Sequence, residues 1–315
     1  MLNANFLKQN AIWLVFIAEI IIFAIASDGT FITGRNIINI SRQVSYYGIA
    51  AIGMTFVILI ADIDLSIGSI ITLVNVVCAW LMVAAGVNMW VAVAISLIMA
   101  TGIGLINAVM VAAVGIPALI ATFASQTVFE GVAYLISGGR PIAGFDSDFG
   151  IFGRWSAFDF LPICAILMII CFALGSFILN KTYFGRYFYA IGGNEEAAEL
   201  SGIRVNRVKY LIYAFSGFFA GLAGIVLLSR ANSAQSTVGK GLEFDVITCV
   251  VLGGVSVYGG VGSMSGVIAG VLIIGSLTNG MILMDVSEYT QMVVKGLVLA
   301  VAVGIDCMSK KRRKR

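Results

Sequence analysis

The sequence of 315 residues contains no histidine, only three prolines and few charged side chains. Without histidine the chain lacks the commonest metal ligand and the commonest general base, so enzymatic chemistry is not expected. The five cysteines lie in or beside apolar runs and show no C-x-x-C spacing, which predicts neither a disulfide framework nor a zinc site. The phosphate-binding signature G-x-x-x-x-G-K-[ST] is also absent. We therefore expect a chain that is not an enzyme, holds no metal or cofactor of its own and does not hydrolyse nucleotide.

The composition instead indicates an integral membrane protein. Hydrophobic residues make up 60% of the chain and charged residues 11%, whereas soluble proteins average about 25% charged. The mean hydropathy is +1.03. The 36 glycines and the lack of polar and apolar alternation favour closely packed helices over a β-barrel. No polar stretch is long enough for a soluble domain, so residues 1–315 are expected to form one membrane domain.

Apolar segments of about 20 residues, the length that crosses a bilayer, predict an all-α protein with about ten transmembrane helices. The expected spans are 11–27, 44–61, 65–85, 89–111, 117–137, 161–179, 209–229, 244–258, 264–284 and 289–307. An even number of spans puts both termini on one side. The basic tail Lys310–Arg315 places that side in the cytosol, where it is expected to meet anionic lipid rather than nucleic acid. The loop 181–209 is then cytosolic and the loop 138–160 periplasmic.

Two pairs of similar segments predict an internal repeat of the parallel kind. Ile67-GSIITLVNVV resembles Val261-GSMSGVIAGV, and Ile103-GLINAVM resembles Ile274-GSLTNGM. Both copies enter in the same direction under this topology. Chance similarity between glycine-rich membrane segments is the alternative interpretation.

The cytosolic loop carries five basic and three acidic side chains and predicts a short docking helix. Asn194 is a good N-cap, Glu195 and Glu196 put negative charge in the first turn, and a left-handed Gly202 would end the helix. Because a helix of about two turns is marginal alone in water, it needs a partner surface, unless the segment is an ordinary solvated loop. The docking segment comprises Gly192, Gly193, Asn194, Glu195, Glu196, Ala197, Ala198, Leu200, Ser201 and Gly202.

A polar stripe in the fifth expected span predicts a translocation path. Thr122, Gln126, Glu130 and Tyr134 recur every four residues on one helix face. This face should line a cavity, or else supply hydrogen bonds that only hold helices together. Lys295, in the last span, is assigned to the same path and needs an anion. Glu130 is the expected partner in a structural ion pair, with Asp285 or Glu288 as alternatives.

Two interruptions between spans are candidate hinges. In the first, Asp64 or Ser66 is expected to cap the next helix, and a metal or acid–base role for the paired Asp62 and Asp64 is weak without histidine. In the second, glycines replace the acids and permit close backbone approach. The hinge set comprises Asp62, Asp64, Ser66, Gly68, Gly253, Gly254, Gly259 and Gly260.

Several blocks resemble the membrane permease subunit of bacterial ATP-binding-cassette importers for monosaccharides, the ribose, galactose, xylose and autoinducer-2 group. They are Ala51-IGMTFVIL, Asp62-IDLSIGS, Pro117-ALIATFAS, Thr182-YFGRYFYAIGGNEEAAELSGI, Gly241-LEFDVITCVVLGGVSVYGGVGS and Tyr289-TQMVVKGLVLAVAV. The central block is the most specific. The family often has glycine just before the acid of the break, whereas Asp62-Ile63 precedes Asp64 here, which leaves the local geometry open.

The resemblance implies two permease copies in the bacterial inner membrane, either identical or paralogous. A periplasmic or lipid-anchored sugar-binding protein would sit on one side and a cytosolic ATPase, usually double-length, on the other. ATP and Mg²⁺ would bind only to that ATPase, and Gly192 to Gly202 would be the coupling segment. The segment Gly139-RPIAGFDSDFG favours a pentose or hexose of the ribose or galactose type.

Three alternatives remain open at this point. The first is a secondary transporter driven by an ion gradient, with Glu130, Lys295 and Asp306 as intramembrane titratable groups. The second is an importer of the same family for another small polar solute, such as autoinducer-2. The third is a channel or scaffold subunit, which would need no energy coupling.

Overall fold

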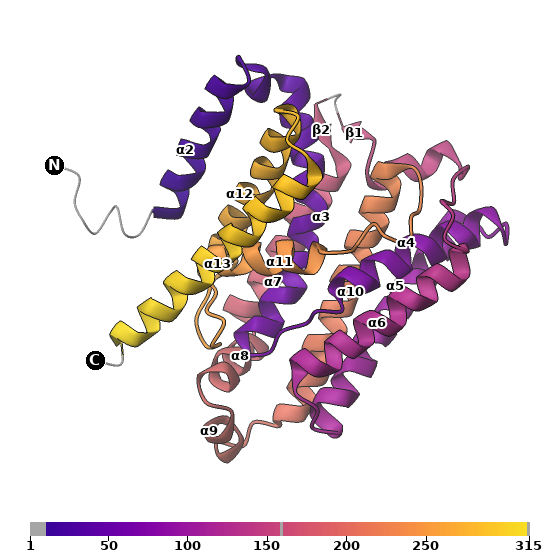
Figure 1. Ribbon diagram of the computed structural model, residues 1–315. Helices are drawn as coiled ribbons and strands as arrows, with labels where there is room; N and C mark the ends of the chain where they lie inside the picture. Colours follow the sequence, from indigo (N-terminus) through magenta and orange to yellow (C-terminus); the bar gives the residue numbers. More distant parts are fainter. Residues whose placement is uncertain (1–10, 158–159, 314–315) are drawn as a thin grey trace.

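The computed structural model describes residues 11–157 and 160–313 and shows a bundle of helices (Figure 1). Lys8 and the side chains of the basic tail lie outside the described residues. The helices are α2 (Ala11–Ala26), α3 (Gly34–Leu59), α4 (Ile67–Val83), α5 (Met89–Ala108), α6 (Ala118–Ser137), α7 (Ile163–Lys181), α8 (Tyr183–Gly193), α9 (Glu195–Leu200), α10 (Val205–Ala231), α11 (Leu242–Leu252), α12 (Met264–Leu283) and α13 (Glu288–Arg313). The predicted all-α class is confirmed.

The remaining elements are short. Two 3-10 helices, η1 (Thr30–Ile32) and η3 (Ser147–Phe152), lie in loops, and a π-helical turn, η2 (Val109–Ala113), extends α5. Two strands of two residues, β1 (Ser156–Ala157) and β2 (Leu161–Pro162), pair antiparallel. Both strands and η3 belong to the connection between α6 and α7, which contains the predicted external loop.

Helices α3 and α10 form the centre of the bundle. The second half of α3, from Gln43 to Leu59, is buried all round, and α10 packs against α3, α4 and α5. Helix α10 is likewise largely enclosed, with an unbroken buried run from Phe219 to Ser229. In Figure 1, α2, α12 and α13 lie to one side of this pair and α4, α5 and α6 to the other. The short α9 lies at one end of the bundle, where α3 and α7 also finish.

Among the described residues, six helices are long and apolar enough to cross a membrane. They are α5 with η2, α6, α7, α10, α12 and the first 21 residues of α13. Helices α2 and α4 are apolar but shorter. The predicted count of ten spans and the cytosolic position of both termini therefore remain predictions.

The two interruptions shift several predicted boundaries. The expected span 244–258 is only an 11-residue helix, α11, because Gly254 adopts a left-handed φ of 84° and the chain then runs without helix to Ser263. The expected span 44–61 is part of a longer α3 that begins at Gly34.

The two pairs of similar segments that predicted an internal repeat differ in their placement. The first-half segments lie in two helices, α4 and α5, whereas the second-half segments lie at and within α12, so they do not correspond helix for helix.

Glycines bring α5 and α10 into backbone contact. A Cβ atom on Gly104 would overlap the carbonyl of Tyr213, and one on Gly217 would overlap the carbonyl of Ala100. Gly102, two residues away on α5, has open space where a Cβ would lie. Small residues at such crossings are the usual means of close packing between membrane helices, because lipid itself gives no drive for helices to associate.

Replacing Gly104 by alanine should therefore destabilise the helix bundle, whereas Gly102→Ala should not. We expect Gly104→Ala to lower the unfolding free energy by about 1–3 kcal/mol, the usual range for overpacking. Thermal unfolding of the purified protein in detergent measures both variants. Equal melting temperatures for the two variants would contradict the packing described.

Candidate coupling and translocation site

Helix α9 is the predicted docking helix, and its ends have the predicted caps. The Asn194 side chain accepts a hydrogen bond from the Ala197 N–H at 3.0 Å, and Gly202 has a left-handed φ of 85°. The helix is six residues long, in keeping with the predicted length of about two turns. So short a helix cannot hold its shape through its own hydrogen bonds alone.

Two contacts within the chain support α9. Lys209, at the start of α10, forms an ion pair with Glu195 at 2.8 Å, and Ala198 is buried. The apolar side chains of α9 are thus divided, since Ala198 packs inside the chain while Ala197 and Leu200 are exposed. Leu200 is 91% exposed. The outer side of α9 therefore offers an apolar contact that nothing in the described chain covers.

The end of α8, directly before α9, lies against the end of α3 and the second interruption. We call this contact the glycine junction, formed by Leu59, Gly192 and Gly260. The Gly260 N–H donates to the Leu59 carbonyl at 2.9 Å. A Cβ atom on Gly192 would overlap both the Leu59 carbonyl and the Gly260 nitrogen, whereas one on Gly193 would meet nothing. Nearby, the Tyr189 hydroxyl donates to the Gly262 carbonyl at 2.9 Å. Three segments far apart in sequence thus meet backbone to backbone.

The first interruption is held by a buried carboxylate. Asp64 is fully buried; its Oδ1 accepts from the Ser66 N–H at 3.0 Å and hydroxyl at 2.6 Å, while Oδ2 accepts from the Ser216 hydroxyl at 2.7 Å. Asn107 of α5 donates to the Ser66 hydroxyl at 2.7 Å. Ser66 is the N-cap of α4 but makes no side-chain cap bond, so Asp64 satisfies the backbone there. Asp64 thus connects the interruption to α10 and, through Ser66, to α5.

Asp62 lies in the first interruption, and Gly68 lies in the first turn of α4, directly after it. The Tyr213 hydroxyl donates to Asp62 at 3.2 Å. A Cβ on Gly68 would overlap the carboxylate of Glu243, so the glycine makes room for that side chain. Among residues 11–157 and 160–313, no group of three or more acidic, cysteine or histidine side chains could hold a metal ion.

The polar stripe of α6 serves two different structural roles. Thr122 is fully buried, accepts from the Leu65 N–H at 3.1 Å and so fastens α6 to the first interruption. One turn later, the amide of Gln126 donates to Glu243 at 3.0 Å and to Glu130 at 3.3 Å. Tyr134, at the far end of the stripe, is 44% exposed. Of the four stripe residues, Gln126 and Glu130 are half-buried and Tyr134 is exposed, whereas Thr122 is inaccessible.

The expected pairing of Lys295 with Glu130 is wrong, and so are the two alternatives. Lys295 binds Asp245 of α11 at 2.7 Å, and the Tyr47 hydroxyl of α3 donates to the same carboxylate oxygen at 3.1 Å. Asp285 lies in a turn and Glu288 begins α13, about two turns before Lys295. Helix α11 packs against both α3 and α13, and this packing places Asp245 beside Lys295.

Sequence reasoning thus missed Asp245 and Glu243, the two acidic residues in the first turn of α11. Both are buried, at 7% and 3% exposure. The signal was present, since two carboxylates two residues apart within an apolar run must each find a partner. It was overlooked because the segment was expected to be an ordinary membrane span.

Neutralising only one member of the Asp245–Lys295 pair should be costly. We expect Asp245→Asn to destabilise the protein by about 3–5 kcal/mol, because it leaves a mostly buried ammonium without its anion. The double variant Asp245→Asn with Lys295→Gln should recover most of that loss. Chemical denaturation of the two single variants and the double variant measures the coupling, and additive effects would contradict the pairing.

Comparisons with known proteins identify the family of the chain. The family described as branched-chain amino acid transport system / permease component matches residues 36–303. The ribose import permease protein of Haemophilus influenzae is 44% identical over 92% of this chain and 91% of its own length. That of Bacillus subtilis is 44% identical over 93% and 90%. The L-arabinose transport system permease protein of Escherichia coli is 38% identical over 90% and 86%.

No solved structure matches the chain. The family match covers most of the sequence, and the relatives align over nearly the whole of both chains. Together with the apolar helices, this places the protein in the inner membrane as a multi-pass protein. The chain belongs to the family of permease components of ATP-binding-cassette monosaccharide importers.

Proposed function

We propose that this chain forms the membrane passage of an ATP-driven importer for a monosaccharide, a pentose or hexose. Two permease copies, identical or paralogous, would surround the passage. A periplasmic or lipid-anchored binding protein would deliver the sugar, and a cytosolic ATPase, usually double-length in this family, would bind ATP and Mg²⁺. Support comes from the relatives, which are named as ribose and arabinose permeases. Both of these sugars are pentoses.

The observation that carries the proposal is the exposed apolar side of α9. Leu200 is almost fully exposed on a helix too short to be stable alone, yet the helix is capped and held in place by Glu195 and Lys209. A fixed apolar contact at the end of a membrane bundle is suited to a partner protein. We assign that partner as the ATPase, with Gly192 to Gly202 as the coupling segment.

The glycine junction supplies the route by which force from the ATPase would reach the passage. A displacement of α9 acts first on Gly192, which lies against Leu59 and Gly260. Leu59 ends α3 directly before the first interruption, and Gly260 lies in the second, so both interruptions would move with α9. We propose that this motion alternately opens the passage to either side. The interruptions 60–66 and 253–262 are then the hinges.

The proposed passage runs along the accessible part of the α6 stripe. Gln126, Glu130 and Tyr134 together offer hydrogen-bond donors and acceptors, which suit the hydroxyl groups of a sugar. Glu243 orients Gln126 from the opposite helix. Thr122 holds the start of the stripe against the first interruption. Lys295 does not face the sugar in this proposal and serves only as the partner of Asp245.

An ion-gradient mechanism is less well supported, because all three of its candidate groups already have partners. Glu130 accepts a hydrogen bond from the Gln126 amide at 3.3 Å. Lys295 is paired with Asp245, and Asp306 accepts hydrogen bonds from the Ser256 hydroxyl at 3.0 Å and the Val257 N–H at 3.1 Å.

Uptake of a panel of labelled sugars and of autoinducer-2 by vesicles carrying the purified complex tests the proposal. We expect ATP-dependent uptake of a pentose or hexose, insensitive to ionophores. Ionophore-sensitive uptake without ATP would contradict it.

Substituting the exposed leucine should separate docking from folding. We expect Leu200→Asp to reduce co-purification of the ATPase about tenfold or more, because it puts a charge at the centre of an apolar contact. The melting temperature should stay unchanged, since Leu200 makes little contact within its own chain. Leu200→Met, which keeps an apolar side chain of similar size, is the control. Normal association of the Asp variant would argue against docking through α9.

Substituting the two adjacent glycines should test transmission. We expect Gly192→Ala to lower ATP-driven uptake about tenfold or more, because the added methyl separates three backbones that now touch. Gly193→Ala adds the same methyl into open space and should transport normally. Both variants should still bind the ATPase, since α9 itself is unchanged. Equal uptake by the two variants would show that the junction carries no force.

A further inference from the structure

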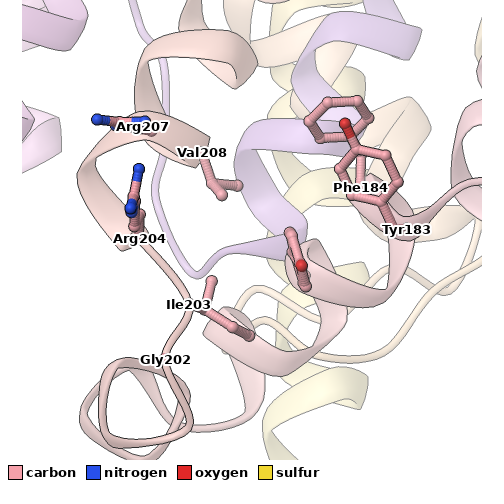
Figure 2. Close-up of a pocket in the computed structure, with 8 residues that line it drawn as sticks. Tyr183, Phe184, Gly202, Ile203, Arg204, Arg207 and Val208 are labelled. Carbon is pink, nitrogen blue, oxygen red and sulfur yellow. The ribbon is translucent and has the colours of Figure 1, made fainter.

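A pocket of about 360 Å³ lies beside the end of α9, between α8 and the start of α10 (Figure 2). Apart from Gly202, where the coupling segment ends, its lining belongs neither to the coupling segment nor to the interruptions or the proposed passage. Its lining residues are Tyr183, Phe184, Tyr187, Gly202, Ile203, Arg204, Arg207 and Val208.

One wall of the pocket is aromatic and comes from α8. The rings of Tyr183 and Phe184 have centroids 4.1 Å apart, and Tyr183 meets Tyr187 edge to face at 5.6 Å. Tyr183 is 51% exposed, although its ring is large. An exposed cluster of aromatic rings at the end of a membrane helix is typical of the bilayer interface, where amphipathic rings lie at headgroup depth.

The opposite wall is cationic. Arg204 and Arg207 are both exposed and extend to the same side of the pocket (Figure 2). Within the described part of the chain, neither guanidinium makes an ion pair or a side-chain hydrogen bond. Guanidinium groups bind phosphate oxygens with two parallel hydrogen bonds, so two unpaired arginines side by side suit a phosphate.

The position of the pocket defines its depth in the membrane. Helix α7 ends at Lys181, two residues before Tyr183, and α10 begins at Val205, next to Arg204. Both helices are long and apolar enough to cross the bilayer. The pocket thus lies where two spans end, at the level of the lipid headgroups. Lys181 and Arg186 add two further exposed cations near α8 without lining the pocket.

We propose that this pocket binds the phosphodiester headgroup of an anionic phospholipid. Arg204 and Arg207 would bind the phosphate, while the rings of α8 would pack against the glycerol and the upper acyl chain. Basic pockets between membrane helices are known to select anionic headgroups. The inference requires only that α7 and α10 span the membrane, so it does not depend on the import function. A bound lipid would also steady Gly202, where the coupling segment ends.

An acidic segment of the ATPase is the other occupant that the charge would fit. The aromatic wall and the position at two span ends favour lipid, because an acidic peptide needs neither. The two occupants also differ in a measurable way. Lipid should remain on the full-length permease when no ATPase is present.

Native mass spectrometry of the purified full-length permease tests the site with phosphatidylglycerol as the probe and phosphatidylcholine for comparison. We expect retained phosphatidylglycerol on the wild type, and about 30-fold weaker retention in Arg204→Gln/Arg207→Gln, since each basic residue contributes about fivefold. The matched control, Lys181→Gln/Arg186→Gln, removes the same charge nearby but off the pocket and should retain lipid within about threefold. Arg204→Lys/Arg207→Lys should give an intermediate loss.

Several results would overturn the proposal. Equal losses in the pocket and control variants would indicate only a diffuse surface charge. Retention of both lipids alike would exclude a site that selects an anionic headgroup. Unchanged lipid retention in the Gln variant together with lost ATPase association would assign the pocket to the ATPase. Should the Gln variant fail to fold, the Lys variant keeps the charge and still tests the bidentate contact.

Discussion

The structure depends on a place where three stretches of backbone touch with no side chain between them. Leu59, Gly192 and Gly260 come from the end of α3, the base of the coupling segment and the second interruption. Side chains can rotate to absorb a displacement, but touching backbones can only move together or separate. In the first interruption, the carboxylate of Asp64 accepts further hydrogen bonds from Ser66 and from Ser216 of α10. A push on α9 therefore acts on a stiff connection, which is what the proposed coupling needs.

The features that could be predicted from the sequence are those that depend on neighbouring residues. Composition and run length predicted an all-α membrane protein, and the N-cap Asn194 with the left-handed Gly202 predicted the ends of α9. The family resemblance, based on blocks spread along the chain, was confirmed by relatives that align over nearly all of it. Helix caps and glycine turns depend on a few consecutive residues, so they can be predicted without knowledge of the packing.

Features that depend on packing could not be predicted. The length of α11 was overestimated because an apolar run continues past Gly254, where the backbone turns left-handed. This error hid Asp245 and Glu243, and Lys295 was consequently assigned to Glu130 instead of Asp245. The same limit applies to Ala198 and Leu200, two apolar residues of one short helix. Only the packing shows that the first is buried in its own chain and that the second is left for a partner.

The central claim is that α9 and the second interruption move as one body. Double electron–electron resonance on the assembled complex tests it most directly, with spin labels on exposed positions and the five native cysteines replaced. One pair would join Glu196 to Val261, across the junction, and a reference pair would join Glu196 to Val114, after α5. The account predicts that adding ATP leaves the first distance unchanged and changes the second. A change in the distance between Glu196 and Val261 would contradict it.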